Sequence, residues 1–190
     1  MHKLAMSVAG LLAVGVAQSA YADIEDHEGF FIYAAMDSYS KTNVKLNIDN
    51  TISVSDSFHG RFGDYNIGAG YFGGVFSISG NFAGMDIDDA RMQRITARVE
   101  MLLIPLDFAP FIVADIGLAH VSYTDELFDI NEMAFTYAAG FGLRARIYDG
   151  LSAKATVLYS RARFDFDVMD VETTLRGRRT SVELGLEYVF

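Results

Sequence analysis

The chain contains no cysteine, and only two prolines stand against 17 glycines in its 190 residues. Without cysteine there can be no disulfide framework and no zinc site built on thiolates. The scarcity of proline favours long uninterrupted strands and argues against disorder. A formal net charge of −10 has the wrong sign for a nucleic-acid partner.

Long apolar runs are also missing beyond the N-terminus. The first 22 residues combine a positive start at Lys3, an apolar run from Leu4 to Ala17 and a small-residue cleavage site at Ser19-Ala20-Tyr21-Ala22. This pattern predicts a secretory signal peptide over 1–22, which leaves 23–190 as one domain. No later stretch offers the roughly 18 to 20 apolar residues of a spanning helix. An exported chain that is 51% hydrophobic is then either a soluble β-protein or a membrane barrel.

The C-terminal segment favours the barrel. Side chains of a strand alternate between its two faces, so the apolar and acidic residues of this segment lie on opposite sides. The apolar face holds Val182, Leu184, Leu186, Tyr188 and Phe190, and the other holds Glu183, Gly185 and Glu187. Aliphatic residues outside and carboxylates inside are typical of a barrel in lipid. A soluble lipocalin-like barrel would show the reverse, a greasy lumen and a polar exterior.

The same alternation recurs along the chain and predicts an all-β fold of eight antiparallel strands. The expected strands are 30–37, 65–71, 76–82, 94–101, 112–119, 135–146, 151–160 and 182–190. Tight turns are expected at Gly73-Gly74 and Asp149-Gly150, and a proline-bracketed turn at 105–110. The other connections, 40–61, 84–91, 123–133 and 164–178, are longer and are predicted to be extracellular loops, with both termini periplasmic.

Aromatic residues are predicted to form two girdles at the membrane interfaces. The girdle near the termini should contain Phe72, Phe76, Phe111, Tyr148, Tyr188 and Phe190. The outer girdle should contain Tyr65, Phe82, Tyr123, Phe135, Tyr137 and Tyr159.

Some charged residues alternate in step with the glycines and therefore lie on the same face of each strand, which is predicted to face the lumen. They are Arg94, Arg98, Glu100, Asp115, Arg144, Arg146, Lys154, Glu183 and Glu187. An eight-stranded barrel has room for little besides side chains, and buried charges must be paired. We therefore expect an ionic network that fills and rigidifies the barrel; a conducting pore is the alternative.

Three arginines fall outward by parity, just above the apolar band on the last two strands: Arg161, Arg163 and Arg178, with Arg176 and Arg179 close by. Guanidinium groups suit phosphates, and this predicts contact with lipopolysaccharide head groups. Ordinary snorkelling arginines are the alternative interpretation.

Other motifs do not predict a catalytic, cofactor or metal site. Gly68-Ala69-Gly70-Tyr71-Phe72-Gly73 matches a dinucleotide fingerprint by letters, but a strand follows it where a helix is required. His120-Val121-Ser122 offers a base and a hydroxyl near the outer rim. The many acidic residues in the predicted loops are most simply solvated, with weak capture of Ca²⁺ or Mg²⁺ as the alternative.

These features together resemble the eight-stranded outer-membrane barrels, the class that contains the OmpA transmembrane domain, OmpX-type and opacity-type proteins. The resemblance implies a monomeric envelope protein with a structural, non-enzymatic role that extends to surface adhesion. A narrow solute channel is one alternative, and a lipid A-modifying enzyme of the deacylase kind is the second. It also implies that the strand ending in Tyr188 and Phe190 is read by the barrel-assembly machinery, after escort by periplasmic chaperones. Lipid A deacylases of this architecture carry a His-x-Ser pair in the seventh strand, where this chain has Leu158-Tyr159-Ser160-Arg161 and lacks the base.

Overall fold

The computed structural model describes residues 28–48, 52–60, 64–87, 90–104, 106–124, 129–168 and 171–190. The predicted signal peptide lies outside them. The described residues form nine strands: β1 (Gly29–Ile48), β2 (Ile52–Gly60), β3 (Tyr65–Gly73), β4 (Phe76–Ile87), β5 (Ala90–Leu102), β6 (Phe108–Thr124), β7 (Asp129–Tyr148), β8 (Leu151–Val168) and β9 (Val171–Val189). No helix in this part of the chain is long and apolar enough to cross a membrane.

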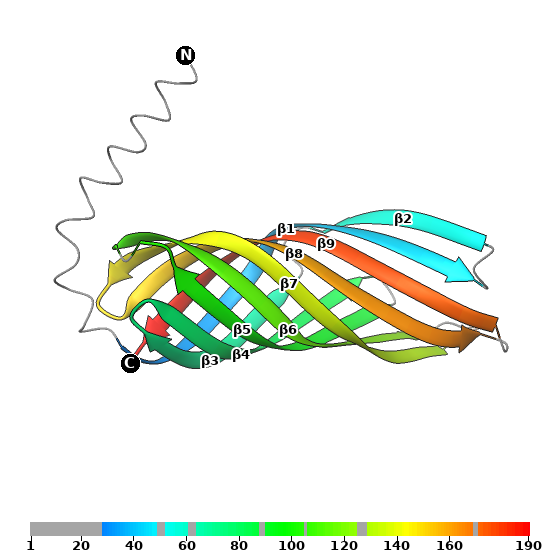
Figure 1. Cartoon of the computed structure of the whole chain (residues 1–190), viewed down its shortest axis with the longest axis horizontal. Helices are drawn as coiled ribbons and strands as arrows, with labels where there is room; N and C mark the ends of the chain where they lie inside the picture. The colour runs from blue at the N-terminus through cyan, green and yellow to red at the C-terminus, as the bar shows by residue number, and fades with distance from the viewer. Residues whose placement is uncertain are drawn as a thin grey trace, which may run out of the picture.

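Eight of the strands close into an antiparallel barrel. Strands β3 to β9 pair in chain order, and β1 pairs with both β3 and β9, which closes the ring (Figure 1). The predicted eight-stranded antiparallel fold is confirmed. Strand β2 lies outside the ring because it pairs with the second half of β1, above the point where β3 ends its pairing.

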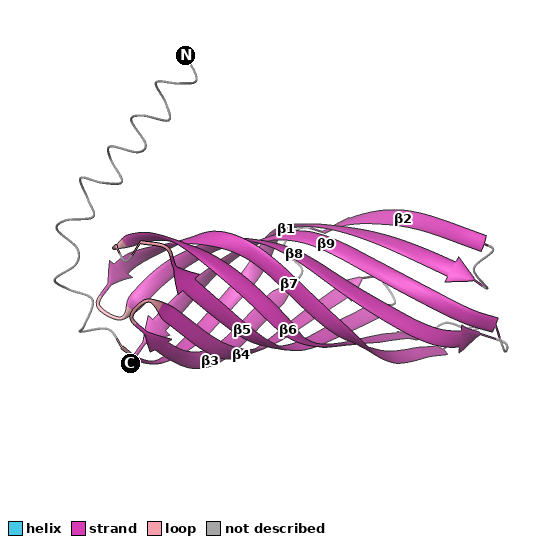
Figure 2. Ribbon diagram, in the orientation of Figure 1, coloured by secondary structure: helices cyan, strands magenta, loops and turns pink. Residues whose placement is uncertain are grey.

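The short turns lie at the barrel end that also holds the C-terminus (Figure 2). Gly74 and Gly150 adopt φ angles of 72° and 71°, which side chains other than glycine rarely tolerate. The first turn therefore begins one residue later than predicted, at Gly74 instead of Gly73. The amide of Phe190 donates to the carbonyl of Phe30 at 2.8 Å, which fixes the last residue at this end.

Strands β1, β2, β8 and β9 reach beyond the other strands at the opposite end (Figure 1). We call this part the extension, and it comprises residues 40–48, 52–60, 160–168 and 171–180. The prediction of long loops at 40–61 and 164–178 is wrong, because most of both segments is paired strand. Segments 84–91 and 123–133 are also largely strand. These strands lack the strongly apolar face that marks the others, so alternation of hydrophobic residues does not reveal them.

A β-bulge at Ser38 separates the barrel part of β1 from the extension. Asp37 pairs with Glu183 and Tyr39 with Val182, so Ser38 is an extra residue on β1. Its hydroxyl donates to the Val182 carbonyl at 3.1 Å. Below the bulge the odd-numbered residues of β1 face inward; above it the even-numbered ones do.

Large apolar side chains cover the outside of the barrel. They include Ile32, Ile67, Ile78, Ile95, Ile116, Phe141, Leu184 and Leu186, all exposed in the isolated chain. At the turn end, Phe30 packs edge-on against Tyr71 with ring centroids 5.7 Å apart. The prediction that Phe72 and Phe111 belong to the aromatic girdle near the termini is wrong, because both side chains are buried in the lumen. They share parity with inward residues, and closeness to a turn does not change the face of a strand residue. The side chain of Tyr123 lies outside the described residues.

The lumen is layered from end to end. An apolar layer near the turns contains Phe31, Phe72, Leu102, Phe111 and Val113. A second apolar cluster near the extension is built on Ala119, Ala134 and Phe164. Charged side chains lie between the two clusters and also against the rings of the first one, where Arg144 faces Phe72 and Lys154 faces Phe111.

Candidate functional site: the filled lumen and the basic outer face

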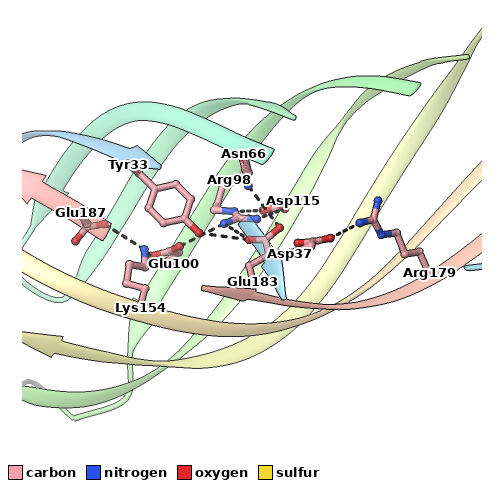
Figure 3. A network of polar contacts seen from close by, with 10 residues as sticks. All are labelled: Tyr33, Asp37, Asn66, Arg98, Glu100, Asp115, Lys154, Arg179, Glu183 and Glu187. Atoms are coloured by element: carbon pink, nitrogen blue, oxygen red, sulfur yellow. Dashed lines mark hydrogen bonds and ion pairs between the residues drawn. The ribbon is translucent and has the colours of Figure 1, made fainter. Parts of the chain in front are cut away.

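Arg98 of β5 is the centre of one group of lumen charges (Figure 3). Its Nε and Nη2 atoms donate to the two carboxylate oxygens of Asp115 at 2.8 and 2.9 Å, a bidentate pair. Its Nη1 donates to Oε2 of Glu183 at 3.2 Å. Arg98 and Asp115 are directly opposite on β5 and β6, whereas Glu183 comes from β9 across the lumen. This arginine therefore connects strands that are not neighbours in the sheet.

Tyr33 and Asn66 complete this group from β1 and β3. The Tyr33 hydroxyl donates to Oε2 of Glu183 at 3.4 Å, and the Asn66 amide donates to Oε1 at 3.5 Å. The Arg98 guanidinium carbon also lies 5.8 Å from the centre of the Tyr33 ring. Glu183 thus receives donors from three strands besides its own.

Lys154 of β8 is the centre of the second group, nearer the turns (Figure 3). Its ammonium group forms a short hydrogen bond to Glu100 and a second one, of 3.1 Å, to Glu187. Arg144 lies opposite Lys154 on β7, and its Nη2 is 3.0 Å from Oε1 of Glu187. Like charges directly opposite repel each other, so the Glu187 carboxylate between them stabilises the pair.

Aromatic faces take up the remaining sides of these cations. The Arg144 guanidinium carbon lies 4.3 Å from the Phe72 ring centre. The Lys154 ammonium lies 4.9 Å from the ring centre of Tyr33 and 5.1 Å from that of Phe111. A desolvated cation over a ring gains further stabilisation from the ring quadrupole. The sequence analysis missed Phe72 and Phe111 as lumen residues, although their parity with inward residues could have identified them.

The other predicted lumen residues lie at the ends of the charged layer. Arg146 is at the turn end, where its Nη1 is 3.3 Å from Oδ1 of the exposed Asp107. Arg94 is half-buried near the extension and lines a small hollow with Asp37 and Arg179. Arg179 points into the lumen, where it forms ion pairs with Asp37 and Asp64. Sequence reasoning had placed Arg179 near the outer basic residues, but it shares parity with Glu183 and faces inward.

The outer face of the extension carries the other predicted site. Directly paired residues share a face, so the registers of β2, β1, β9 and β8 define two rows across the sheet. One row is Ser57, Asn43, Arg178 and Arg161; the next is Ser55, Lys45, Arg176 and Arg163. The predicted Arg161, Arg163 and Arg178 are therefore brought together. Arg176, Lys45 and Lys41 join them on the same face, and the incorrect loop assignment concealed Lys41 and Lys45.

The two β8 arginines of these rows have partners within the protein. Arg161 donates through Nε to the Tyr159 hydroxyl at 3.1 Å and lies over that ring. Arg163 donates to Asp165 at 3.0 Å. The hydrogen bond from the Thr174 hydroxyl, with a smaller contribution from Arg163, lowers the pKa of Asp165.

This pKa predicts a local pH dependence of the extension. A carboxylate with a lowered pKa stabilises the folded state above its ordinary pKa of about 3.9, and this contribution is lost as the pH falls through the folded value. We expect Thr174→Val to raise the pKa of Asp165 toward the ordinary value, which a carbon-13 NMR titration of its carboxyl group measures. An unchanged titration midpoint in the variant would show that Thr174 is not the cause.

The remaining candidates form no constellation with a clear chemistry. His120 Nε2 lies 2.5 Å from Oδ1 of Asn131, and the His120 side chain forms no further hydrogen bond or ion pair within the described residues. Tyr188 and Phe190 are exposed at the turn end with ring centroids 5.1 Å apart. Across the described ranges, no three His, Cys, Asp or Glu side chains group as a metal site would require.

The closed ring, the apolar exterior and the charged interior define an eight-stranded antiparallel β-barrel with the fold of the small outer-membrane barrels. Two solved barrels share the fold. Neisserial surface protein A is 15% identical, with 85% of this chain and 97% of that one covered and a TM-score of 0.57. The N-terminal barrel domain of Pseudomonas aeruginosa OprF is 10% identical, with 82% and 99% covered and a TM-score of 0.52. No known family profile matches the sequence. No curated protein matches it either.

Proposed function

We propose that this protein is an integral outer-membrane barrel with a non-enzymatic role in the cell envelope, its turn end in the periplasm and its extension outside the cell. The observation that carries this proposal is the filled lumen. Arg98, Lys154 and Glu183 are almost wholly buried and are held in multivalent ion pairs, so a solute would have to break several of them to pass.

The apolar exterior supports the membrane location. Exposed aliphatic residues would be costly in water over so large a surface, whereas lipid covers them without penalty. The two comparison barrels support the outer membrane through their shared fold. Assembly would use the exposed terminal aromatics Tyr188 and Phe190 as the signal for the barrel-assembly machinery, with periplasmic chaperones as earlier partners. The extension would then present the surface available for adhesion.

A narrow channel is the competing function, and a lipid A-modifying enzyme is another. Recording single-channel currents across planar bilayers tests the first. Steady conductance through the purified barrel would contradict the proposal that side chains close the lumen to solutes. A change in lipid A mass on expression would support the enzyme.

Lipopolysaccharide is the proposed partner of the outer basic face. Arg161 is directly opposite Tyr137 on β7 and directly opposite Arg178 on β9, and it lies two residues beyond Tyr159 on its own strand. The rings of Tyr137 and Tyr159 are exposed, and such rings prefer the level of lipid head groups. The planar guanidinium group of arginine can form two parallel hydrogen bonds to a phosphate group, such as those of lipid A.

Replacing these three arginines by glutamine is expected to reduce the lipopolysaccharide that co-purifies with the barrel by on the order of tenfold, since each charge-assisted hydrogen bond contributes about 1.5–3 kcal/mol before solvent exposure weakens it. Phosphate analysis of the purified protein measures this. Gln replacement of Arg146, at the turn end, serves as the control. If the triple variant and the wild type co-purify with equal amounts of lipopolysaccharide, these arginines do not bind it.

A further inference from the structure

The outer face of the extension contains a surface hollow that the lipid contact does not explain. It has a volume of about 490 Å³ and lies over β2, β1 and β9. Six of its lining residues belong to the outer face: Asn43, Lys45, Ser55, Ser57, Arg176 and Arg178; Val44 and Asp56 complete the lining. These are the β2, β1 and β9 members of the two rows described above, so the hollow lies beside Arg161 and Arg163 but does not include them.

Two of the three cations of the hollow have no internal partner. No salt bridge or hydrogen bond joins Lys45 or Arg178 to another residue in the described part of the chain. Arg176 forms no such bond either, but its charge helps to lower the pKa of Asp165 on β8. Asp56, which also lines the hollow, accepts a hydrogen bond from the Ser57 amide at 2.7 Å. All three cations are exposed.

The register makes this arrangement unfavourable without an anion. Arg176 is directly opposite Lys45 on one side and Arg163 on the other. Arg178 is directly opposite Arg161. Like charges that face each other across a sheet destabilise it, and here they are concentrated in a chain whose net charge is −10. Asp165 offsets part of this repulsion at Arg163 and Arg176. A bound anion with at least two negative groups would offset the repulsion that is left in both rows.

The spacing and the neutral groups narrow the ligand class. The two rows lie two residues apart along the strands, roughly 7 Å, and neighbouring strands are roughly 4.8 Å apart. The hydroxyls of Ser55 and Ser57 and the amide of Asn43 form the β2 side of the hollow. Such groups suit sugar hydroxyls. Among the described residues of its wall none is aromatic, so the base stacking that single-stranded nucleic acids use is missing.

We propose that this hollow binds an anionic saccharide, one that carries two or more phosphate or sulfate groups. Lys45, Arg176 and Arg178 hold the anionic groups, while Ser55, Ser57 and Asn43 hydrogen-bond to the sugar. The ligand comes either from the phosphorylated core of the envelope's own lipopolysaccharide or from a sulfated glycan outside the cell. This inference depends on the proposed orientation only for where the ligand comes from, because binding itself needs no membrane.

Calorimetry on the full barrel in zwitterionic micelles tests the proposal. The probes are a lipid-free phosphorylated core oligosaccharide, a sulfated oligosaccharide of similar length, the phosphatase-treated core and inorganic phosphate. We expect at least one anionic saccharide to bind, with no binding of the phosphatase-treated core and no displacement by inorganic phosphate at the same phosphate concentration. Whichever anionic probe binds identifies the source. Failure of both anionic saccharides at millimolar concentration overturns the proposal, and so does equal competition by inorganic phosphate.

Two double variants remove the same charge from different places. Lys45→Gln with Arg176→Gln removes two positive charges from the wall of the hollow. It leaves the three arginines of the proposed lipid contact unchanged. We expect it to weaken saccharide binding on the order of tenfold. Lys41→Gln with Arg163→Gln, outside the hollow, should change binding less than about threefold. Equal losses in both variants would mean that only the overall charge matters, which overturns the site.

The neutral side of the hollow gives an independent measurement. Asn43→Leu keeps every charge and should still weaken binding of the saccharide several-fold; an unchanged affinity counts against a sugar ligand. Faster migration of unheated protein on a denaturing gel checks that each variant is folded. The lipid contact can fail in the co-purification assay while saccharide binding persists, so the two proposals are separable.

Discussion

Replacing Arg98 with methionine is expected to lower the free energy of unfolding by about 3–5 kcal/mol, the usual cost of removing one partner of a buried ion pair. Arg98 is only 2% exposed and serves Asp115 and Glu183 at once. Methionine fills much of the same volume, so the loss reports the uncompensated carboxylates and not a cavity. Urea unfolding in lipid vesicles, followed by the gel shift between folded and unfolded barrel, measures the change.

The matched control for this experiment is Arg178→Gln, which removes an arginine from the exposed outer face and should change stability by less than about 1 kcal/mol. A double variant, Arg98→Met with Asp115→Leu, should recover part of the loss because one unpaired carboxylate is removed with the cation. A cost for Arg98→Met no larger than the control would mean that water, not the protein, solvates these carboxylates. The lumen would then be open, and the channel would become the better function.

Placing an arginine on the outer wall at Ile95 is expected to cost about 2–4 kcal/mol in a bilayer, the range for a charge facing lipid near the midplane. Ile95 is 67% exposed in the isolated chain and lies in the middle of the apolar exterior. Water would solvate the new charge readily, but hydrocarbon does not. Unfolding of Ile95→Arg in lipid vesicles measures the effect.

Val54 offers the comparison, because it is 54% exposed on β2 in the extension. Val54→Arg should be nearly neutral if that strand stands in water. Similar small effects at both positions would show that the apolar exterior is not in contact with lipid. A large effect at Val54 alone would reverse the proposed placement of the two regions.

The sequence was sufficient for the faces of the barrel strands. Alternation assigns Arg98, Glu100, Lys154 and Glu183 to the inside, since parity within a regular strand does not depend on tertiary structure. It does not assign partners. Lys154 on β8 reaches Glu100 on β5, with β6 and β7 between them in the sheet, and that contact depends on how far each strand is staggered around the ring.

The extension shows where alternation stopped being informative. Thr42, Val44 and Leu46 do alternate with Lys41, Asn43 and Lys45, but neither set is strongly apolar. Sequence reasoning interpreted such a mixture as a loop. Pairing on both sides, with β2 and with β9, makes a strand there without help from lipid. The grouping of cations from β1 and β9 could not be predicted until those strands were placed next to each other.

The extra residue at Ser38 has a consequence for how this wall can change over time. Asp37 and Tyr39 pair with the adjoining residues Glu183 and Val182, so the alternation on the two sides of Ser38 is already in step without it. Loss of Ser38 would therefore leave Asp37 in the lumen and Lys41 on the outer face. The strand can lose one residue at this point without exchanging its inner and outer surfaces.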